Sequence, residues 1–378
     1  VLKNMAKSSM PDLIVEGVNT TTVPRKVTDP RLSHKVSILN EGFDTANHGV
    51  LQTRMHIVLC YKKLRDNGDS GWHVGGWIKD TLAKALDEDP ILAGRLARSE
   101  DGGLEIVSND SGVRIVEARI PLSLAEFLES EDKDEIKTEL VSWKGVDESN
   151  PQFSALFYIQ VTNFQCGGYS VGISSSLLLA DPFRMVKFLN RWSEIHRSTA
   201  YEGEIPKTPL FYAPNFAKAV GCPAPAATTA ASDPSWINSE TAIFNISIDE
   251  KLSLRDEIYK HIVSLCIEKA EDHFGLKVAS NFVLITKEPS GDAKVEKSSK
   301  QGSFGSLESM KCEIKSSNWE DLGTNKIAFI RDNLPIEVSH WVARNDYEGV
   351  VLVVISSPWE GKYGMKVYVT FPRENGLY

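Results

Sequence analysis

Residues 154–197, SALFYIQVTNFQCGGYSVGISSSLLLADPFRMVKFLNRWSEIHR, form the stretch from which the fold is predicted. Apolar and polar residues alternate from Phe157 to Phe164, and a second short strand is expected from Tyr169 to Ile173. The Cys166-Gly167-Gly168 run between them is typical of a tight turn, so the sequence predicts a β-hairpin. A helix is expected after Asp181-Pro182, because this pair suits an N-cap and a first helical residue, and apolar residues then recur every three or four positions.

Residues 159–168 read IQVTNFQCGG, and residues 177–181 read LLLAD. The first run resembles a strand of the plant BAHD acyltransferases, written roughly Leu-x-Val-Gln-Val-Thr-x-Phe-x-Cys-Gly-Gly. In that family the hairpin leads into a His-x-x-x-Asp motif, whose His is the general base of acyl transfer from coenzyme A thioesters. The resemblance places Asp181 at the Asp of the motif and Leu177 at its His, with Ser176 where a second His is frequent.

The substitution at Leu177 has a chemical consequence. A general base must titrate near neutral pH and reach the acceptor hydroxyl or amine, and leucine can do neither. A serine such as Ser176 is a poor nucleophile without a basic partner. The three serines at 174–176 are expected at a strand end, and the three leucines at 177–179 in the core.

Further stretches resemble the same family. Residues 90–96, PILAGRL, are similar to its Pro-Leu-Ala-Gly-Arg-Leu run, and a hairpin is expected from Leu104–Val107 and Val113–Ala118. Within the family, the patterns at Asn109–Arg114 and Gln160–Gly168 are similar to those of the ECERIFERUM wax proteins. The family's Asp-Phe-Gly-Trp-Gly-Lys-Pro stretch corresponds here to residues 328–335, AFIRDNLP, which lack the Gly-Trp-Gly.

Composition limits the classes of partner. The chain has 378 residues and a net charge of −9, which disfavours a general affinity for nucleic acid or anionic lipid. Its five cysteines form no C-x-x-C pair, so neither a disulfide framework nor a metal site is predicted. No apolar run is long enough for a signal peptide or a membrane span, so a cytoplasmic location is expected, or one at the cytosolic face of the endoplasmic reticulum through a partner.

The expected architecture is an α/β fold of mixed sheets and helices. The resemblance implies the two-domain, chloramphenicol-acetyltransferase-like fold of BAHD proteins, with a channel between the domains. We expect an N-terminal domain at 1–203, a proline-rich crossover at 204–240 and a C-terminal domain at 241–378. Further strands and helices are expected near 36–39, 55–61, 77–86, 241–248, 253–274, 281–287, 350–355 and 365–371. Residues 290–306 are expected to form a mobile loop.

Four lysines are candidates for binding a cofactor. Lys287 stands near where the family often has an Arg that supports the motif's Asp, so a contact with Asp181 is expected from the resemblance. Lys294, Lys297 and Lys300 are candidates for a phosphate, although no glycine pattern of a phosphate loop accompanies them. No permanently bound cofactor is predicted, and coenzyme A or an acyl-CoA is the ligand that the resemblance implies.

Two functions remain open. The first is a non-catalytic BAHD-like protein in plant acyl, lipid or specialised metabolism, which holds a small-molecule or acyl ligand in the channel or binds a partner enzyme. The second is an acyl-CoA-dependent acyltransferase, or an enzyme of altered chemistry, in which another group replaces the lost base. The candidates for that group are His34, His48, His56, His73, His196 and His340. Loss of both the His and the Gly-Trp-Gly favours the first function.

Overall fold

The computed structural model describes residues 12–24, 31–39, 49–64, 71–202, 205–208, 239–249, 256–277, 281–299, 312–344, 349–357 and 362–372. Its helices are α1 (Gly71–Glu88), α2 (Leu124–Glu129), α3 (Lys133–Glu139), α4 (Pro182–Ala200) and α5 (Asp256–Phe274). Its strands are β1 (Ile14–Thr21), β2 (Ser33–Ile38), β3 (Arg54–Tyr61), β4 (Arg95–Arg98), β5 (Leu104–Val107), β6 (Val113–Ile120), β7 (Phe157–Phe164), β8 (Tyr169–Ser176), β9 (Tyr201–Glu202), β10 (Ile205–Pro206), β11 (Glu240–Asp249), β12 (Asn281–Lys287), β13 (Ala293–Ser299), β14 (Cys312–Ser317), β15 (Glu337–Ala343), β16 (Gly349–Ile355) and β17 (Lys362–Phe371).

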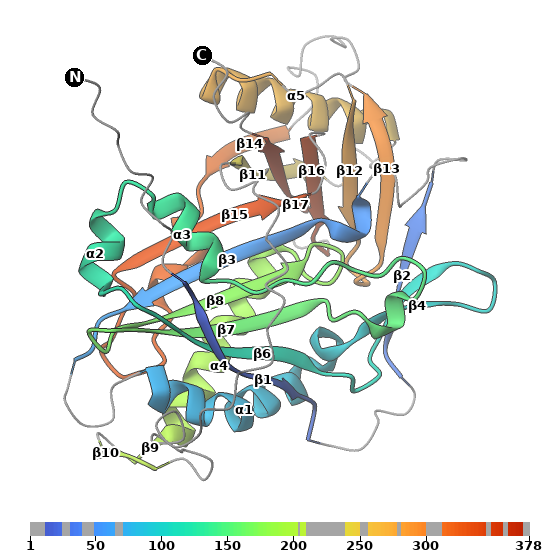
Figure 1. The fold of residues 1–378 in the computed structure, drawn as a ribbon. Coiled ribbons are helices and arrows are strands. Elements are labelled where there is room, and N and C mark those ends of the chain that lie inside the picture. The colour runs from blue at the N-terminus through green and yellow to red at the C-terminus, as the bar shows by residue number, and fades with distance from the viewer. Residues whose placement is uncertain are drawn as a thin grey trace, which may run out of the picture.

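The first of the two large sheets has six strands in the order β1-β6-β7-β8-β3-β15 (Figure 1). The predicted hairpin is confirmed at its centre, where β7 and β8 pair antiparallel with Ile159 opposite Ile173. Gly167 in the connecting turn has φ 83°, a left-handed conformation that glycine adopts without steric cost. All eight residues of β8 are buried, so the strand that leads to Leu177 lies between two covered faces.

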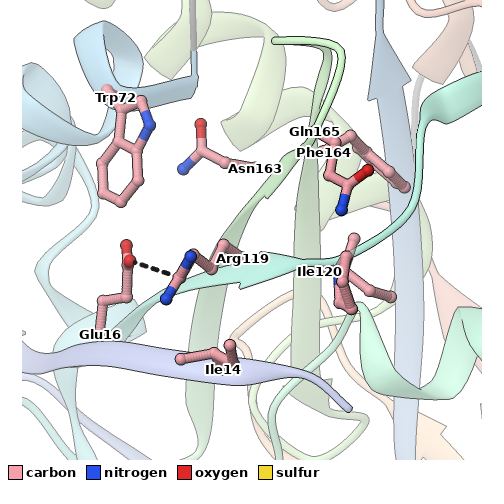
Figure 2. Close-up of a pocket in the computed structure, with 9 residues that line it drawn as sticks. Ile14, Glu16, Trp72, Arg119, Ile120, Asn163, Phe164 and Gln165 are labelled. Carbon is pink, nitrogen blue, oxygen red and sulfur yellow. Dashed lines mark ion pairs between the residues drawn. The ribbon is translucent and has the colours of Figure 1, made fainter. Parts of the chain in front are cut away.

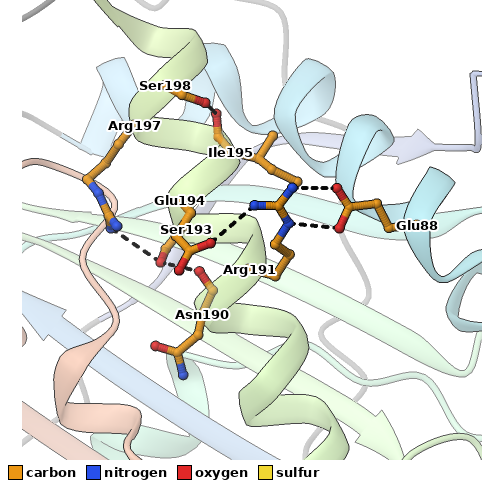
Figure 3. Close-up of polar contacts among 8 residues, drawn as sticks. All are labelled: Glu88, Asn190, Arg191, Ser193, Glu194, Ile195, Arg197 and Ser198. Atoms are coloured by element: carbon orange, nitrogen blue, oxygen red, sulfur yellow. Dashed lines mark hydrogen bonds and ion pairs between the residues drawn. The ribbon is translucent and has the colours of Figure 1, made fainter.

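Helices α1 and α4 cover one face of this sheet, below the strands in Figure 1. Alternate residues of β3, such as Ile57 and Leu59, pack into the same apolar core as Trp192 of α4. The Trp192 indole Nε1 donates a hydrogen bond to Thr81 Oγ1 of α1 at 3.1 Å. At the exposed rim, Figure 3 shows Arg191 of α4 paired with the carboxylate that ends α1.

The opposite face of the six-stranded sheet packs against α2 and α3. Val58 and Cys60 of β3 enter this smaller core together with Phe127 of α2 and Ile136 of α3. Helix α2 begins with a capping box, in which Ser123 and Glu126 satisfy each other's backbone N–H groups. Both faces of the sheet are therefore covered, and every residue of β3, β7 and β8 is buried.

The second large sheet has nine strands in the order β14-β11-β17-β16-β12-β13-β2-β5-β4, and α5 covers one of its faces (Figure 1). Ile262, Cys266 and Ala270 of α5 pack in one core with alternate residues of the strands, among them Phe282 and Leu284 of β12. The other face of β12 carries Val283 and Ile285 into the core shared with the six-stranded sheet. The fold is therefore the expected α/β arrangement of mixed sheets.

Both sheets contain strands from both halves of the chain. Strand β15 joins the six-stranded sheet, with His340 opposite Ile57 of β3. Strand β2 joins the nine-stranded sheet, with Val36 opposite Ala293 of β13. The division into 1–203, 204–240 and 241–378 stays a prediction, and most of the crossover, residues 204 and 209–238, lies outside the described residues.

The hairpin expected from Leu104–Val107 and Val113–Ala118 is wrong. Strand β5 pairs with β2 and β4, whereas β6 pairs with β1 and β7 in the other sheet. The turn after β4 explains the difference: Ser99 N donates to Gly103 O at 2.9 Å, and Gly102 has φ 84°. This local turn closes a β4–β5 hairpin, so the Asn109–Gly112 segment crosses between sheets.

Two expectations about loops are also corrected. The stretch expected to be a mobile loop contains β13, because Ala293 and Val295 are buried and pair antiparallel with β12. Gly291, with φ 94°, supplies the turn that lets the chain reverse. Near the N-terminus, where a single short strand was expected, β1 forms an additional edge strand of the six-stranded sheet.

Candidate functional site

Residues 176–181, which the sequence resemblance matches to the family's motif, are called the degenerate motif. They lie where β8 ends and α4 begins. Ser176 closes β8, and its backbone N–H donates to Leu156 O at 2.9 Å. Asp181 is the N-cap of α4, since its Oδ1 accepts a hydrogen bond from Arg184 N at 3.0 Å. Pro182 follows at the first helical position, as predicted. Four residues therefore link the end of a buried strand to the helix cap.

Leu177, which the sequence resemblance matches to the family's base, is only 1% exposed. Its backbone N–H donates to Thr53 O of the chain before β3 at 3.1 Å, and its side chain belongs to the main apolar core. Ser176 is fully buried, and its Oγ accepts a hydrogen bond from Leu178 N at 3.2 Å. Neither side chain offers a group that titrates near neutral pH, so the two positions supply no general base.

Lys287, at the end of β12, reaches the motif from the nine-stranded sheet. Its Nζ donates to the backbone carbonyl oxygen of Leu178 at 2.5 Å, and the side chain is 4% exposed. Burial lowers the pKa of Lys287 to about 7, partly offset by the nearby negative charge of Asp181. Lys287 thus donates a hydrogen bond to the motif's backbone, and the charge of Asp181 raises its pKa.

The other lysine candidates do not converge on one point. Lys294 lies opposite Thr286 and Lys297 opposite Val283 in the β12–β13 ladder. Because side chains alternate along a strand, these two lysines project from opposite faces of the sheet. Lys294 also forms an ion pair with Glu288. Lys300 lies outside the described residues.

Among the candidate bases, His56 makes two close polar contacts in a buried setting. Its Nδ1 lies 2.8 Å from Ser174 Oγ, and its Nε2 accepts a hydrogen bond from Arg54 Nε at 3.1 Å. Since the arginine is always a donor, the proton of the neutral ring must be on Nδ1, which then donates to Ser174. Burial, followed by the charge of Arg54, lowers the His56 pKa well below its usual value. His56 is therefore unable to take a proton from Ser174.

Three further histidines are held in packed layers. His196 is buried between α4 and α1, where Nδ1 lies 3.1 Å from Thr81 Oγ1 and burial lowers its pKa to about 3. His73, in α1, packs against Tyr201 with ring centroids 5.5 Å apart. His340 stacks on Trp319 at 4.8 Å, and burial lowers its pKa to about 4. His48 lies outside the described residues.

His34 lies in β2, and charges at the start of α4 and at the end of β12 act on it. Arg184 and Lys287 both lower its pKa, after the larger effect of burial, whereas Asp292 and Asp89 raise it. Arg184 stands in the first turn of α4 and forms a two-bond ion pair with Asp89, at 3.2 and 2.7 Å. Sequence reasoning missed this pair, although Asp89 before Pro90 and an arginine three residues after the N-cap were visible.

Residues 328–335, which lack the Gly-Trp-Gly, still pack against α4. Phe329 is fully buried and meets Trp192 edge-on, with ring centroids 4.7 Å apart. Arg197 of α4 donates to the carbonyl oxygen of Ala328, and Asn333 Nδ2 donates to Lys62 O at 2.9 Å. This segment therefore binds α4 and the end of β3 with contacts that need no glycine.

A model of the Transferase family matches residues 43–283, well over half of the chain. The chain belongs to this family of BAHD acyltransferase-like proteins. It is 32% identical over 152 residues to a hydroxycinnamoyltransferase of Narcissus pseudonarcissus, a match that covers 40% of this chain and 34% of the relative. It is 34% identical over 117 residues to Protein ECERIFERUM 26-like of Arabidopsis thaliana, a match that covers 31% of this chain and 27% of that relative. The chain thus spans about a third or less of these curated relatives.

Among solved structures, vinorine synthase is similar to this BAHD chain with a TM-score of 0.48 and 15% sequence identity, over 96% of this chain and 95% of that one. In the described ranges, no helix has the length and apolar character needed to cross a membrane. The same ranges hold no cluster of three His, Cys, Asp or Glu side chains suited to a metal ion.

Proposed function

We propose that this BAHD protein is a non-catalytic member of its family and does not transfer an acyl group. In this function it binds a small-molecule or acyl ligand, or it binds a partner enzyme. Leu177 carries the proposal, because a buried leucine stands where acyl transfer needs a base. The plant relatives suggest a role in acyl, lipid or specialised metabolism. We place the protein in the cytoplasm, or at the cytosolic face of the endoplasmic reticulum through a partner.

Coenzyme A or an acyl-CoA is the ligand that we propose for the boundary between the two large sheets. Support comes from the residues that meet at the start of α4. Lys366 of β17 lies over the Phe183 ring, 4.9 Å from its centroid, and donates to Asn245 Oδ1 at 2.6 Å. Phe183 is exposed, and the negative charge of Asp181 acts on Lys366. A cation beside an exposed ring suits a ligand with phosphate and apolar parts.

An acyltransferase with a different base is the second candidate function. His34 favours it, because its pKa is lowered and the neutral ring can accept a proton at pH 7. The charges of Arg184, in the first turn of α4, and of Lys287, which hydrogen-bonds the motif's backbone, both act on His34. In this second function, burial and then the charges of Arg184 and Lys287 hold the pKa of His34 below its usual value, and the Leu177 position only shapes the site.

One experiment separates the two functions. Purified protein is incubated with acetyl-CoA or p-coumaroyl-CoA and with shikimate or putrescine, and products are measured by mass spectrometry. The non-catalytic function predicts product at the background rate, with coenzyme A binding detected by calorimetry. Robust turnover would refute it. If turnover appears and His34→Ala removes it by about 10²–10⁴-fold while the control His273→Ala does not, the second function holds.

A further inference from the structure

A cavity at the opposite end of β8 from the motif has no role in the proposed function. It has a volume of about 290 Å³ and lies among β1, β6, the end of β7 and the start of α1 (Figure 2). Its wall includes Phe164 and Gln165, which enter the turn before β8, whereas the motif follows Ser176 at the other end of that strand. Seven residue steps of a strand separate the two sites by roughly 23 Å.

An ion pair forms one wall of the cavity. Arg119 Nε lies 3.1 Å from Glu16 Oε1, with Arg119 on β6 and Glu16 on β1 (Figure 2). Burial raises the pKa of Glu16, although the charge of Arg119 opposes this effect. The pair has no net charge, but it presents N–H donors and carboxylate acceptors side by side. An anion would meet Glu16 and a cation would meet Arg119, so the wall favours a neutral group with both a donor and an acceptor.

Aromatic and apolar side chains form the rest of the cavity. The Trp72 ring, in the first turn of α1, stands over Glu16 in Figure 2. Ile14 and Ile120 complete the apolar lining near the ion pair. A flat aromatic ring would gain stacking and burial against the indole. The volume lies at the lower end of ligand pockets, which limits the occupant to one or two rings.

Asn163 adds an unpaired acceptor. It is 7% exposed, and among the described residues its Oδ1 has no hydrogen-bond partner. Figure 2 shows its amide extending toward Trp72. The oxygen lies against Gly71, where an added Cβ would come within 2.4 Å of it. Rotation about the terminal torsion of the amide would let a ligand N–H pair with this oxygen, and it would break the 3.5 Å hydrogen bond that Asn163 Nδ2 donates to Ala118 O.

We propose that this cavity binds a small neutral aromatic compound that carries a carboxamide group. The ring lies against Trp72, the carbonyl oxygen accepts from the Arg119 guanidinium, and the amide N–H donates to Glu16 or Asn163. The site differs from the degenerate motif in both place and chemistry, and the inference does not depend on the proposed function.

Benzamide is the probe for the test, compared with benzoate and benzylamine as charged analogues of the same size. Saturation-transfer NMR and calorimetry on the full chain are expected to detect benzamide at millimolar affinity and the two ions at least about fivefold more weakly. Trp72→Ala is expected to weaken benzamide at least about tenfold. Phe153→Ala is the control, since this ring is 78% exposed and outside the cavity. Equal binding by all three probes, or no loss with Trp72→Ala, would overturn the proposal.

A charge switch keeps the test decisive if Trp72→Ala does not fold. Glu16→Gln keeps the shape of the side chain and leaves Arg119 as an unopposed cation. This variant is expected to bind benzoate at least as tightly as benzamide, reversing the order of the unmodified protein. An unchanged order would show that the ion pair does not select the ligand, and the proposal would fail.

Discussion

At the scale of single residues, Leu177 differs in chemistry from a base and also lies in the wrong surroundings for one. The side chain is packed in the main core, and the nearby Asp181 carboxylate accepts from the α4 backbone. An imidazole placed there would lose hydration, which lowers its pKa and disfavours its protonated form. Restoring the family's residue type is therefore not the same as restoring a site.

Leu177→His alone is expected to raise acyl transfer from p-coumaroyl-CoA by less than about tenfold, well short of the 10²–10⁴-fold that a positioned general base contributes. Product formation by mass spectrometry is the measurement. Leu177→Met, which nearly conserves volume, is the control for disturbance of the core. A gain of a hundredfold or more would mean that the rest of the catalytic site is intact.

Lys287 predicts a pH dependence of stability. Burial lowers its pKa to about 7, below the roughly 10.4 of an unfolded chain, so between these values the folded state binds fewer protons. Its contribution to the free energy of unfolding must then rise with pH, by up to about 1.4 kcal/mol per unit. Urea unfolding at pH 7, 8 and 9 checks this, as the difference between the unmodified protein and Lys287→Met. A difference that is flat or falls with pH would contradict the buried, low-pKa lysine.

At the scale of elements, Asp181 acts on the helix that it begins. Asp181→Ala removes the hydrogen bond to Arg184 N and is expected to lower the free energy of unfolding by about 0.5–2 kcal/mol. Asp181→Asn keeps a capping oxygen and is expected to lose much less. Chemical denaturation of both variants is the measurement. Equal losses would show that the charge of Asp181, rather than its cap, stabilises the start of α4.

Local signals were enough to predict the central elements. The alternation in 157–164, the glycine turn and the Asp-Pro pair at 181–182 all act within a few residues, and the structure confirms the hairpin and the start of α4. Pairing between distant strands leaves no such signal. No residue near Leu104 indicates that β5 pairs with β2. Two turns could follow from the sequence, at Gly102 and at Asn109–Gly112, and only the second was predicted, whereas the hairpin forms at the first.

In the candidate site, too, contacts between distant parts of the chain could not be predicted from the sequence. The motif alone is enough to predict that Leu177 takes the place of the family's base, and this stays a prediction. The effect of Arg184 and Lys287 on His34 was not predictable in this way, because it depends on the packing of β2 beside β13. The split of Lys294 and Lys297 to opposite faces also needed the strand assignment, since a loop has no alternating faces.

At the scale of the whole molecule, the exchange of strands joins the two halves of the chain. Strand β15 forms the edge of the six-stranded sheet and pairs with residues 54–60 of β3, and β2 connects β13 to β5 in the nine-stranded sheet. Removing either half leaves rows of backbone N–H and C=O groups without partners. It also exposes the core shared by β12 and the six-stranded sheet.

A fragment of residues 1–203 is therefore expected not to fold by itself, although its length is that of an ordinary domain. In the fragment β3 keeps β8 but loses β15, so it becomes an exposed edge strand, and β2, β4 and β5 lose the rest of their sheet. Circular dichroism should show no cooperative unfolding of the fragment, and its amide NMR spectrum should be poorly dispersed. Co-expression with residues 204–378 should restore cooperative unfolding and good dispersion. The full chain under the same conditions is the control. Cooperative unfolding of the isolated fragment would show that the exchanged strands are accessory and that each half contains a core sufficient for folding.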